Sequence, residues 1–279
     1  RRPLAEAPPE LLTGQRRMAC ILGILGAHQM PAKRLAGLAT IAMLTTRLAA
    51  QAPGKWPPDS LVNTQVIPKS TPVIQVIGTM RNFAAHLGVR CHFCHLGVEG
   101  QPLDQFDFAS DEKRTKVVAR QMMRMMGQIN AQLDSLPGRA ANGLQVTCGT
   151  CHRGVSRPVP LSTLIAEVGQ TAGADSAIRA YRSLRERYYG ADAYDFGESS
   201  LNIAAFRLGR SKRVVEGLAI LDHNEGLFPG SSGLAVFRGN LLLMKGDTAA
   251  AANSFREAVR RDPRNDEARG RLKDIGATP

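Results

Sequence analysis

The sequence predicts a mainly α-helical protein, and three observations support this fold class. Aromatic residues make up 5% of the 279 residues, which is low for a β-rich protein. Apolar residues recur at helical spacing over residues 73–87 and 118–133. Between residues 205 and 263, small, large and proline positions match at a separation of 34, as in a helical repeat. We therefore expect a helical unit followed by a helical repeat domain.

The N-terminal region has the pattern of a secretory signal peptide that starts at Met30. Lys33 and Arg34 form its charged start, residues 35–46 are a short apolar stretch, and small residues follow at 48–52. This stretch is too short to cross a bilayer, which takes about 20 residues. We expect residues 30–52 to be a cleaved signal peptide and residues 1–29 to be absent from the mature protein. The protein is then expected in the periplasm or another extracytoplasmic space, either free or membrane-associated.

The formal net charge of +12 raises the question of a nucleic-acid partner. Residues 1–50 carry seven Arg and Lys against two Glu, so +7 of the charge belongs to the rest of the chain. No nucleic-acid-binding motif accompanies this charge. We therefore expect no nucleic-acid partner and interpret the basic residues as a solvated surface.

A first helix is expected over residues 73–87. Ser70-Thr71-Pro72 has a hydroxyl for capping and a proline for the first turn, and Gly88 ends the helix. The pentapeptide Cys91-His92-Phe93-Cys94-His95 begins three residues after Gly88. The apolar stripe of this helix consists of Val73, Val76, Ile77, Met80, Ala84 and Leu87.

A second helix is expected to begin near Ser110, with Asp111 and Glu112 in its first turn, and to stop at Leu136-Pro137-Gly138. A second pentapeptide, Cys148-Gly149-Thr150-Cys151-His152, follows after a loop. Residues 53–160 thus have the plan helix, motif, loop, helix, motif. The apolar stripe of the second helix consists of Val118, Met122, Met125, Ile129 and Leu133.

Residues 161–279 follow the boundary Pro158-Val159-Pro160 and are expected to form a tetratricopeptide-like helical repeat domain. An earlier helix near residues 174–188, with Ala177 and Tyr181, is a candidate for a third hairpin. The alternative is an ordinary amphipathic helical bundle. Stacked repeats form a concave surface, so we expect this domain to dock a partner. The matching positions are Ala205 and Gly239, Leu208 and Leu242, Gly217 and Ala251, Leu221 and Phe255, and Pro229 and Pro263.

Each pentapeptide has the form Cys-x-x-Cys-His, which is the attachment site of c-type haem. The two thiols bond the two vinyl groups of one porphyrin, and the next residue places an imidazole under the iron. Two complete motifs use four of the five cysteines, so we predict two covalently attached haem c groups. The porphyrin-bonding residues are Cys91, Cys94, Cys148 and Cys151, and the iron-binding histidines are His95 and His152.

Other cysteine chemistries explain the two motifs less well. A structural zinc site built from paired Cys-x-x-Cys knuckles normally separates them by roughly 15–20 residues, and Cys94 and Cys148 are much farther apart. Such a site also has no need of His directly after each knuckle. A thioredoxin-like dithiol needs a βαβ context, and a disulfide framework leaves the paired histidines unexplained.

Each iron needs a donor for its sixth position. For the first site, Met80 lies on the apolar stripe eleven residues before Cys91, and His86 and His92 are rivals. For the second site, periodicity does not select one donor among the four methionines of residues 122–126. Met122 and Met125 share the apolar face of the second helix, with the other two methionines at 123 and 126.

Residues 72–157 resemble the cytochrome c subunit of photosynthetic reaction centres. That subunit consists of units in which a helix with an axial Met precedes a Cys-x-x-Cys-His loop. In this chain, residues 119–130 and 146–154 carry the resemblance for the second unit, and residues 80–95 carry it for the first. The resemblance implies that Met80 and Met122 are the sixth ligands.

The whole chain departs from that subunit in two respects. The subunit carries four haems and lacks a helical extension, whereas this chain has two motifs and the segment 161–279. The chain looks more like dihaem proteins that share this cytochrome fold and append tetratricopeptide repeats.

The expected function is electron transfer by an exported protein that is not an enzyme. His and Met together saturate each iron, and a thioether ligand raises the reduction potential relative to two histidines. We expect redox partner proteins, with a membrane-bound electron-transfer complex among the candidates, docked through the helical repeats. One alternative is a dihaem enzyme such as a peroxidase, which needs an iron position that opens. Another is a haem-based redox sensor on a repeat scaffold.

Overall fold

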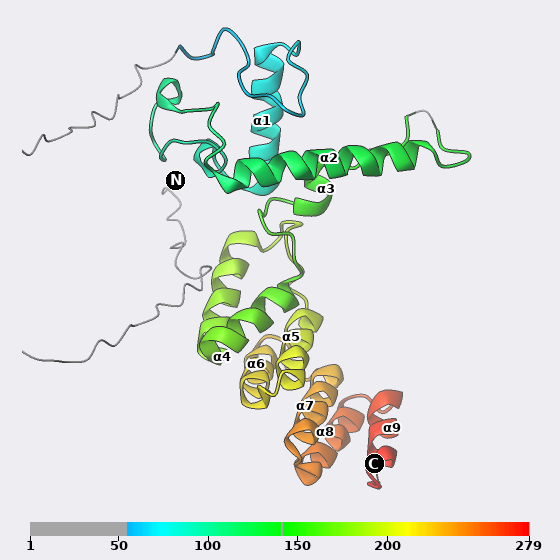
Figure 1. The fold of residues 1–279 in the computed structure, drawn as a ribbon. Coiled ribbons are helices and arrows are strands. Elements are labelled where there is room, and N and C mark those ends of the chain that lie inside the picture. The colour runs from blue at the N-terminus through cyan, green and yellow to red at the C-terminus, as the bar shows by residue number, and fades with distance from the viewer. Residues whose placement is uncertain (1–54, 141, 279) are drawn as a thin grey trace, which may run out of the picture. The chain divides into compact units, whose positions relative to one another are not determined.

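The computed structural model describes residues 55–140 and 142–278 and is built from helices (Figure 1). Within these residues the chain forms no β-strand, so the predicted mainly α class is confirmed. The predicted signal peptide at 30–52 and the segment 1–29 lie outside the described residues. Residues 55–154 are called the first part of the protein. Its helices are α1 (Val73–Leu87), the short 3-10 helices η2 (Cys91–Phe93) and η3 (Leu103–Gln105), α2 (Arg114–Asp134) and α3 (Cys148–His152).

Helix α1 has the predicted bounds but a different start. Pro72 is the residue that precedes the first turn, at φ −57°, and no side chain caps the helix. The expected capping hydroxyl is therefore wrong. Since proline is held near this φ and lacks an N–H that would need a partner, it starts the helix by itself. At the other end Gly88 adopts the left-handed conformation at φ 65°, as predicted.

Helix α2 begins at Arg114 and not near Ser110, so the predicted start is wrong. The carbonyl of Ser110 accepts a hydrogen bond from the Lys116 ammonium at 2.7 Å, so its partner is a side chain and not a helical amide. Asp111, which we expected in the first turn, instead forms ion pairs with Lys116 and Arg120. With these side-chain contacts in place, the helix begins one turn later than predicted.

The second part of the chain is a succession of helices with a 34-residue recurrence. Helices α5 (Glu198–Arg210) and α6 (Val214–Leu227) are followed by α7 (Ser232–Lys245) and α8 (Thr248–Arg261), each starting 34 residues after its counterpart. The predicted helical repeat region is thus present, while its assignment to the tetratricopeptide class stays a prediction. The remaining helices are α4 (Leu161–Tyr188) and α9 (Asp266–Asp274).

The candidate third hairpin falls within α4. This helix is broken at Gly173, which has φ 81° and ψ 172°, so residues 161–172 and 174–188 are two helical segments. Ala177 and Tyr181 are both buried in the second segment. Figure 1 shows the change of direction between the two segments.

The matched small residues of the repeats lie where paired helices approach closely. A Cβ on Gly217 of α6 would lie 2.7 Å from the Ala205 carbonyl oxygen of α5. A Cβ on Gly239 of α7 would lie 2.4 Å from the Phe255 ring of α8. Real Cβ contacts are never so short, so each helix pair depends on a small residue at this position.

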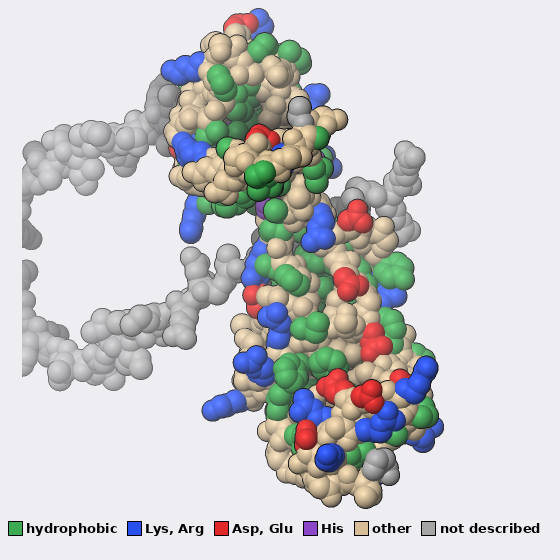
Figure 2. Space-filling view, turned by 90° about the vertical axis from the view of Figure 1, so that its right-hand side faces the viewer, with side chains coloured by type: hydrophobic (Ala, Val, Ile, Leu, Met, Phe, Trp, Pro, Cys, Tyr) green, Lys and Arg blue, Asp and Glu red, His purple; other side chains and the backbone are tan. Residues whose placement is uncertain are grey.

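The surface of the repeat region is mixed in charge. Figure 2 shows Lys and Arg side chains interspersed with Asp and Glu on the visible face, without a continuous patch of one sign. This agrees with a solvated surface. None of the described helices combines the length and the apolar character that crossing a membrane requires.

The buried apolar side chains are distributed unevenly along the chain. Those of the described residues all lie at Val155 or later, and most of them form two clusters among α4 to α9. In residues 55–154, leaving aside residue 141, the buried side chains are those of Lys116 and Arg120. The first part of the protein therefore has apolar helices but no apolar core of its own.

Candidate haem sites

The first motif forms a tight turn. The amides of Cys94 and His95 both donate to the Cys91 carbonyl, at 3.2 and 3.0 Å. This turn places Cys91, Cys94 and His95 next to one another, as attachment to a single porphyrin requires. Cys91 is exposed and Cys94 is half-buried.

His95 packs against an aromatic side chain of the following loop. Its ring meets the Phe108 ring edge-on, with 4.9 Å between centroids. Burial lowers the pKa of His95 to about 4, and the nearby Lys116 ammonium acts in the same direction. The imidazole is therefore neutral at neutral pH, which is the form that binds a metal. Its Nδ1 is buried without a hydrogen-bond partner.

The start of α2 holds the first motif. The Lys113 ammonium donates to the His92 carbonyl, and the Thr115 hydroxyl donates to the Phe93 carbonyl. Both acceptors lie inside the Cys-x-x-Cys segment. The second helix therefore fixes the backbone that carries the two thiols.

The second motif forms the short helix α3. Thr147 and Thr150 cap it reciprocally, and the Thr147 amide donates to the Thr150 hydroxyl at 3.0 Å. Nδ1 of His152 lies 2.9 Å from the Val155 carbonyl oxygen. Since a carbonyl only accepts, Nδ1 carries the proton, and the lone pair of Nε2 is left for iron.

Helix α2 also holds the segment that leads into the second motif. The Asn130 side chain donates to the Val146 carbonyl at 2.9 Å and accepts from the Val146 amide at 2.7 Å. Val146 is two residues before Cys148. One helix therefore positions both motifs, the first at its start and the second in its later half.

The end of α1 lies directly against the second motif. The Gly154 amide donates to the His86 carbonyl at 2.8 Å, and a Cβ on Gly88 would lie 2.1 Å from the Gly154 carbonyl oxygen. The His86 ring lies beside Gly149, where a Cβ would meet it at 2.9 Å, and its Nδ1 is buried without a partner. His86, a sequence-based rival for the first site, is thus a neighbour of the second motif.

The predicted axial methionines lie on the expected helices. Met80 is on the half-buried face of α1. Met122 and Met125 of α2 are 41% and 45% exposed, so exposure does not separate them. Met123 and Met126 are half-buried. The choice of Met80 and Met122 stays a prediction.

The residues present fit two haem groups. Apolar side chains of residues 55–154 stay partly exposed although they recur on helical faces, and a large apolar group is what would cover them. Val118, Met122 and Met125 share one face of α2 and are exposed there. Together with two Cys-x-x-Cys-His turns and a His152 whose Nε2 is free to bind, this is the donor set of c-type haem.

Sequence reasoning missed the cluster formed by Asp111, Lys116 and Arg120. Lys116 and Arg120 are one turn apart on α2, and their side chains face inward with Asp111 between them. The only signal in the sequence was the spacing of two basic residues one helical turn apart, which is usually a solvated face.

The other cysteine chemistries gain no support. Within residues 55–278, apart from 141, no three His, Cys, Asp or Glu side chains gather into a group that would hold a metal ion, as a joint zinc site requires. The four motif cysteines are free thiols. Burial raises the pKa of Cys94 and of Cys148, whereas a reactive redox dithiol has a lowered thiol pKa.

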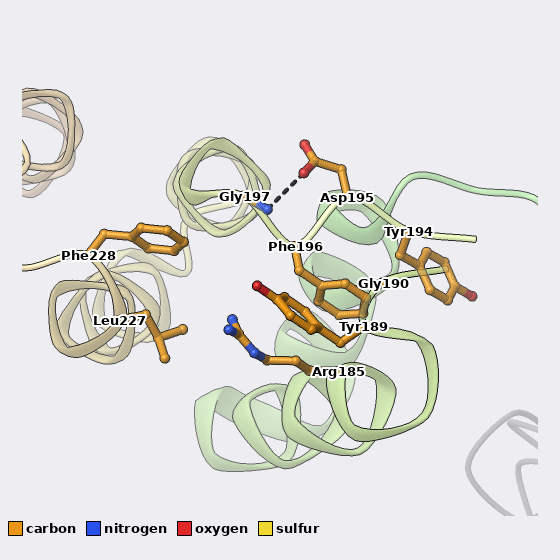
Figure 3. A pocket seen from close by; sticks show the side chains of 9 residues that line it. All are labelled: Arg185, Tyr189, Gly190, Tyr194, Asp195, Phe196, Gly197, Leu227 and Phe228. Atoms are coloured by element: carbon orange, nitrogen blue, oxygen red, sulfur yellow. Dashed lines mark hydrogen bonds between the residues drawn. The ribbon is translucent and has the colours of Figure 1, made fainter. Parts of the chain in front are cut away.

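The repeat region has a cavity of about 340 Å³ between the end of α4, the loop after it and the end of α6 (Figure 3). Arg185 stacks over the Tyr189 ring at 4.5 Å and, with Phe196, points into this cavity. None of its lining residues belongs to a haem motif. The full set is Arg185, Tyr189, Gly190, Tyr194, Asp195, Phe196, Gly197, Leu227 and Phe228.

Comparison with known proteins agrees with the motifs. Residues 91–186 match the sequence model of the photosynthetic reaction centre cytochrome C subunit. Cytochrome c-554 of Chloroflexus aurantiacus is 39% identical over 67 residues, which is 24% of this chain and 14% of that protein. The photosynthetic reaction center cytochrome c subunit of Rubrivivax gelatinosus is 38% identical over 85 residues, 30% of this chain and 19% of that protein.

The similarity thus spans less than a fifth of the length of each of these two relatives. The residues that match the family model, 91–186, include both Cys-x-x-Cys-His motifs and the first residues of the repeat region. The part of this chain that carries the two motifs is therefore similar to the cytochrome c subunits of photosynthetic reaction centres.

Proposed function

We propose that this protein is an exported dihaem c-type cytochrome that carries electrons between redox partner proteins. The observation that carries the proposal is the combination of two complete motifs with a helical segment that lacks an apolar core. Residues 55–154, residue 141 aside, bury no hydrophobic side chain, although α1 and α2 both have apolar faces. Two porphyrins would supply the missing apolar interior.

The chain's own residues would hold the groups and close the irons. Cys91 and Cys94 would bond one porphyrin, and the pair at 148 and 151 the other. His95 and His152 would bind the two irons from one side, and a bound haem supplies one-electron chemistry. Met80 and Met122 would fill the sixth positions, which leaves no open site for a substrate. A closed iron suits an electron carrier.

The remaining segments support export and docking. The signal-like sequence at 30–52 fits a protein whose haems are attached outside the cytoplasm. One relative is named as a subunit of a photosynthetic reaction center, which makes a membrane-bound electron-transfer complex a reasonable class of partner. Helices α5 to α8 would provide the docking surface, as stacked helical repeats do in other proteins.

Neither alternative function is favoured by a specific observation. A peroxidase needs an iron position that opens and an acid–base group beside it. The two spare imidazoles close to the motifs along the chain are those of His92, inside the first motif, and His86, which packs against Gly149 of the second motif. The names of the two relatives are those of cytochromes and not of enzymes.

The test is the intact mass and N-terminal sequence of the full-length gene product purified from the extracytoplasmic fraction. We expect a chain that begins after residue 52 and carries two haem additions. Replacing Cys148 and Cys151 with Ala should remove one addition. A mass with bound zinc or a single haem would refute the dihaem proposal, and an N-terminus before Met30 would refute cleavage at the predicted signal.

A further inference from the structure

The first part of the protein buries two cations and no apolar side chain. Lys116 and Arg120 of α2 are each 8% exposed, and no other residue of 55–154 is buried, with residue 141 not described. A buried charge is costly unless it is fully hydrogen-bonded. The Lys116 ammonium donates to the three carbonyls of residues 108–110 at 2.8, 3.0 and 2.7 Å. Arg120 donates to the Asn63 carbonyl at 2.8 Å.

These hydrogen bonds determine what the two cations can do. Each charge is held by fixed backbone oxygens from the loop before α2 or from the segment before α1. A flexible surface lysine would move to water, but Lys116 already uses its three donors on carbonyl groups. Lys116 and Arg120 therefore hold their positive charges at defined positions in the fold.

The cluster has a net positive charge. The Asp111 carboxylate lies 3.2 Å from the Lys116 ammonium and 2.8 Å from the Arg120 guanidinium. The hydrogen bond from Arg120 holds the pKa of Asp111 far below its usual range, so this carboxylate stays ionised at working pH. Two cations and one anion leave one positive charge uncompensated within the cluster.

This charge lies close to the first motif. Phe108 presents its carbonyl to Lys116 at 2.8 Å and its ring to the ring of His95, at 4.9 Å between centroids. Only one residue therefore separates the buried ammonium from the imidazole that would bind the first iron. The Lys113 ammonium, on the His92 carbonyl, adds a further positive charge on the same side of the motif.

We propose that Lys116 and Arg120 raise the reduction potential of the haem at the first motif. The inference rests on the proposed function, since it requires a haem at residues 91–95. Reduction removes one positive charge from the iron, so a fixed cation nearby favours the reduced state. The effect is larger for a buried charge than for an exposed one, because water screens the interaction less. The pair thus gives the two haems different potentials.

The test is a spectroelectrochemical titration of the full-length, haem-loaded protein, resolved into two potentials. Lys116→Gln keeps a hydrogen-bond donor but removes the charge, and it should lower one potential and leave the other in place. Arg120→Gln should lower the same potential. Arg124→Gln is the matched control, because Arg124 is exposed one turn later on α2, and it should move neither potential.

The sign of the potential shift in Asp111→Asn distinguishes an electrostatic effect from a loss of local structure. This substitution removes the negative charge of the cluster, so it should raise the potential that Lys116→Gln lowers. If the substitutions acted by disrupting local structure, Lys116→Gln and Asp111→Asn would shift that potential in the same direction. In a chain with Cys148 and Cys151 replaced by Ala, which keeps only the first motif, the same opposite shifts should occur in the remaining haem.

Three results would overturn the inference. The first is a shift of the same sign in Lys116→Gln and Asp111→Asn. The second is the absence of any shift in Lys116→Gln and Arg120→Gln while both haems are present. The third is a shift confined to the haem of the second motif. A wild-type protein without two haems would refute the proposed function, whereas only the absence of a haem at residues 91–95 would refute the inference as well.

Discussion

The two histidines predicted to bind iron, His95 and His152, differ in how their rings are held. Nδ1 of His152 donates to the Val155 carbonyl, which fixes both the tautomer and the ring orientation. His95 has no such partner for Nδ1 and is held by contact with the Phe108 ring. A carbonyl acceptor on Nδ1 makes a ligating imidazole a stronger donor, so His152 already has the support that an iron-binding histidine needs.

At the residue scale, the ligand choice between Met122 and Met125 gives a direct prediction. Met122→Ala should open one iron, which would then bind carbon monoxide, and should lower the potential of that haem because a neutral thioether donor is lost. Met125→Ala should leave the spectrum low-spin. Optical spectra of the reduced proteins with and without carbon monoxide measure both outcomes.

Met125→Ala also has an expected cost in stability. Met125 is 45% exposed, so its loss should destabilise the protein by less than the roughly 2–5 kcal/mol of a fully buried methionine. If Met125→Ala opened an iron and Met122→Ala did not, the ligand assignment would be wrong, although the two haems would remain.

At the scale of elements, the end of α1 and the turn after α3 form a joint that depends on glycine. Gly88 has φ 65° and ends α1, and Gly154 has φ 87° two residues after His152 of the second motif. Their backbones lie so close that a Cβ on Gly88 would overlap the Gly154 carbonyl. The helix with Met80 and the second motif are therefore fixed to each other through backbone atoms.

Because the Gly88 and Gly154 backbones lie so close, we expect Gly88→Ala to destabilise the haem-loaded protein. The left-handed conformation alone costs an L-residue roughly 1–2 kcal/mol, and the overlap with Gly154 adds to it. Thermal unfolding followed by circular dichroism should show a lower Tm. Gly78→Ala is the matched control in the same helix, since a Cβ there meets nothing within 4 Å.

The control should change stability in the opposite direction. Alanine is favoured over glycine inside a helix by roughly 0.5–1 kcal/mol, so Gly78→Ala should raise Tm slightly. A Gly88→Ala protein as stable as the wild type would show that α1 and the second motif are not in contact as described.

At the scale of the whole molecule, the two parts of the chain differ in what makes them stable. Helices α4 to α9 bury two clusters of apolar side chains, with Tyr181 and Phe255 among the largest. Helices α1 and α2 bury none in the described structure. Apolar burial is the main favourable contribution to folding, so we expect residues 161–279 to be stable without a cofactor and residues 55–154 to depend on haem for stability.

This difference predicts the behaviour of the full-length chain without haem. With Cys91, Cys94, Cys148 and Cys151 all replaced by Ala, the backbone amides of α5 to α8 should remain protected from hydrogen exchange. Those of α1 and α2 should exchange rapidly. In the haem-loaded wild type, both sets should be protected. Equal protection of α1 and α2 with and without haem would contradict the haem-dependent core.

Features that depend on local spacing could be predicted from the amino-acid sequence. These features are the two Cys-x-x-Cys-His motifs, the apolar stripe of α1 that ends at Gly88, and the 34-residue recurrence of helices. In each of them the residues are close in sequence or regularly spaced along the chain. Local geometry dictates such features, so periodicity and turn residues are enough to predict them. The same reasoning failed at the start of α2, where carbonyls bind Lys116 from outside the helix.

Contacts between residues far apart in the chain became known from the folded structure and not from the sequence pattern. The contact of His86 with Gly149 joins residues far apart in sequence, and the burial of Lys116 and Arg120 depends on the loop that folds over them. A pattern of charges along a helix looks the same whether it faces water or backbone oxygens. The energetic balance between desolvation and hydrogen bonding is set by the surrounding atoms, and these are defined only once the chain has folded.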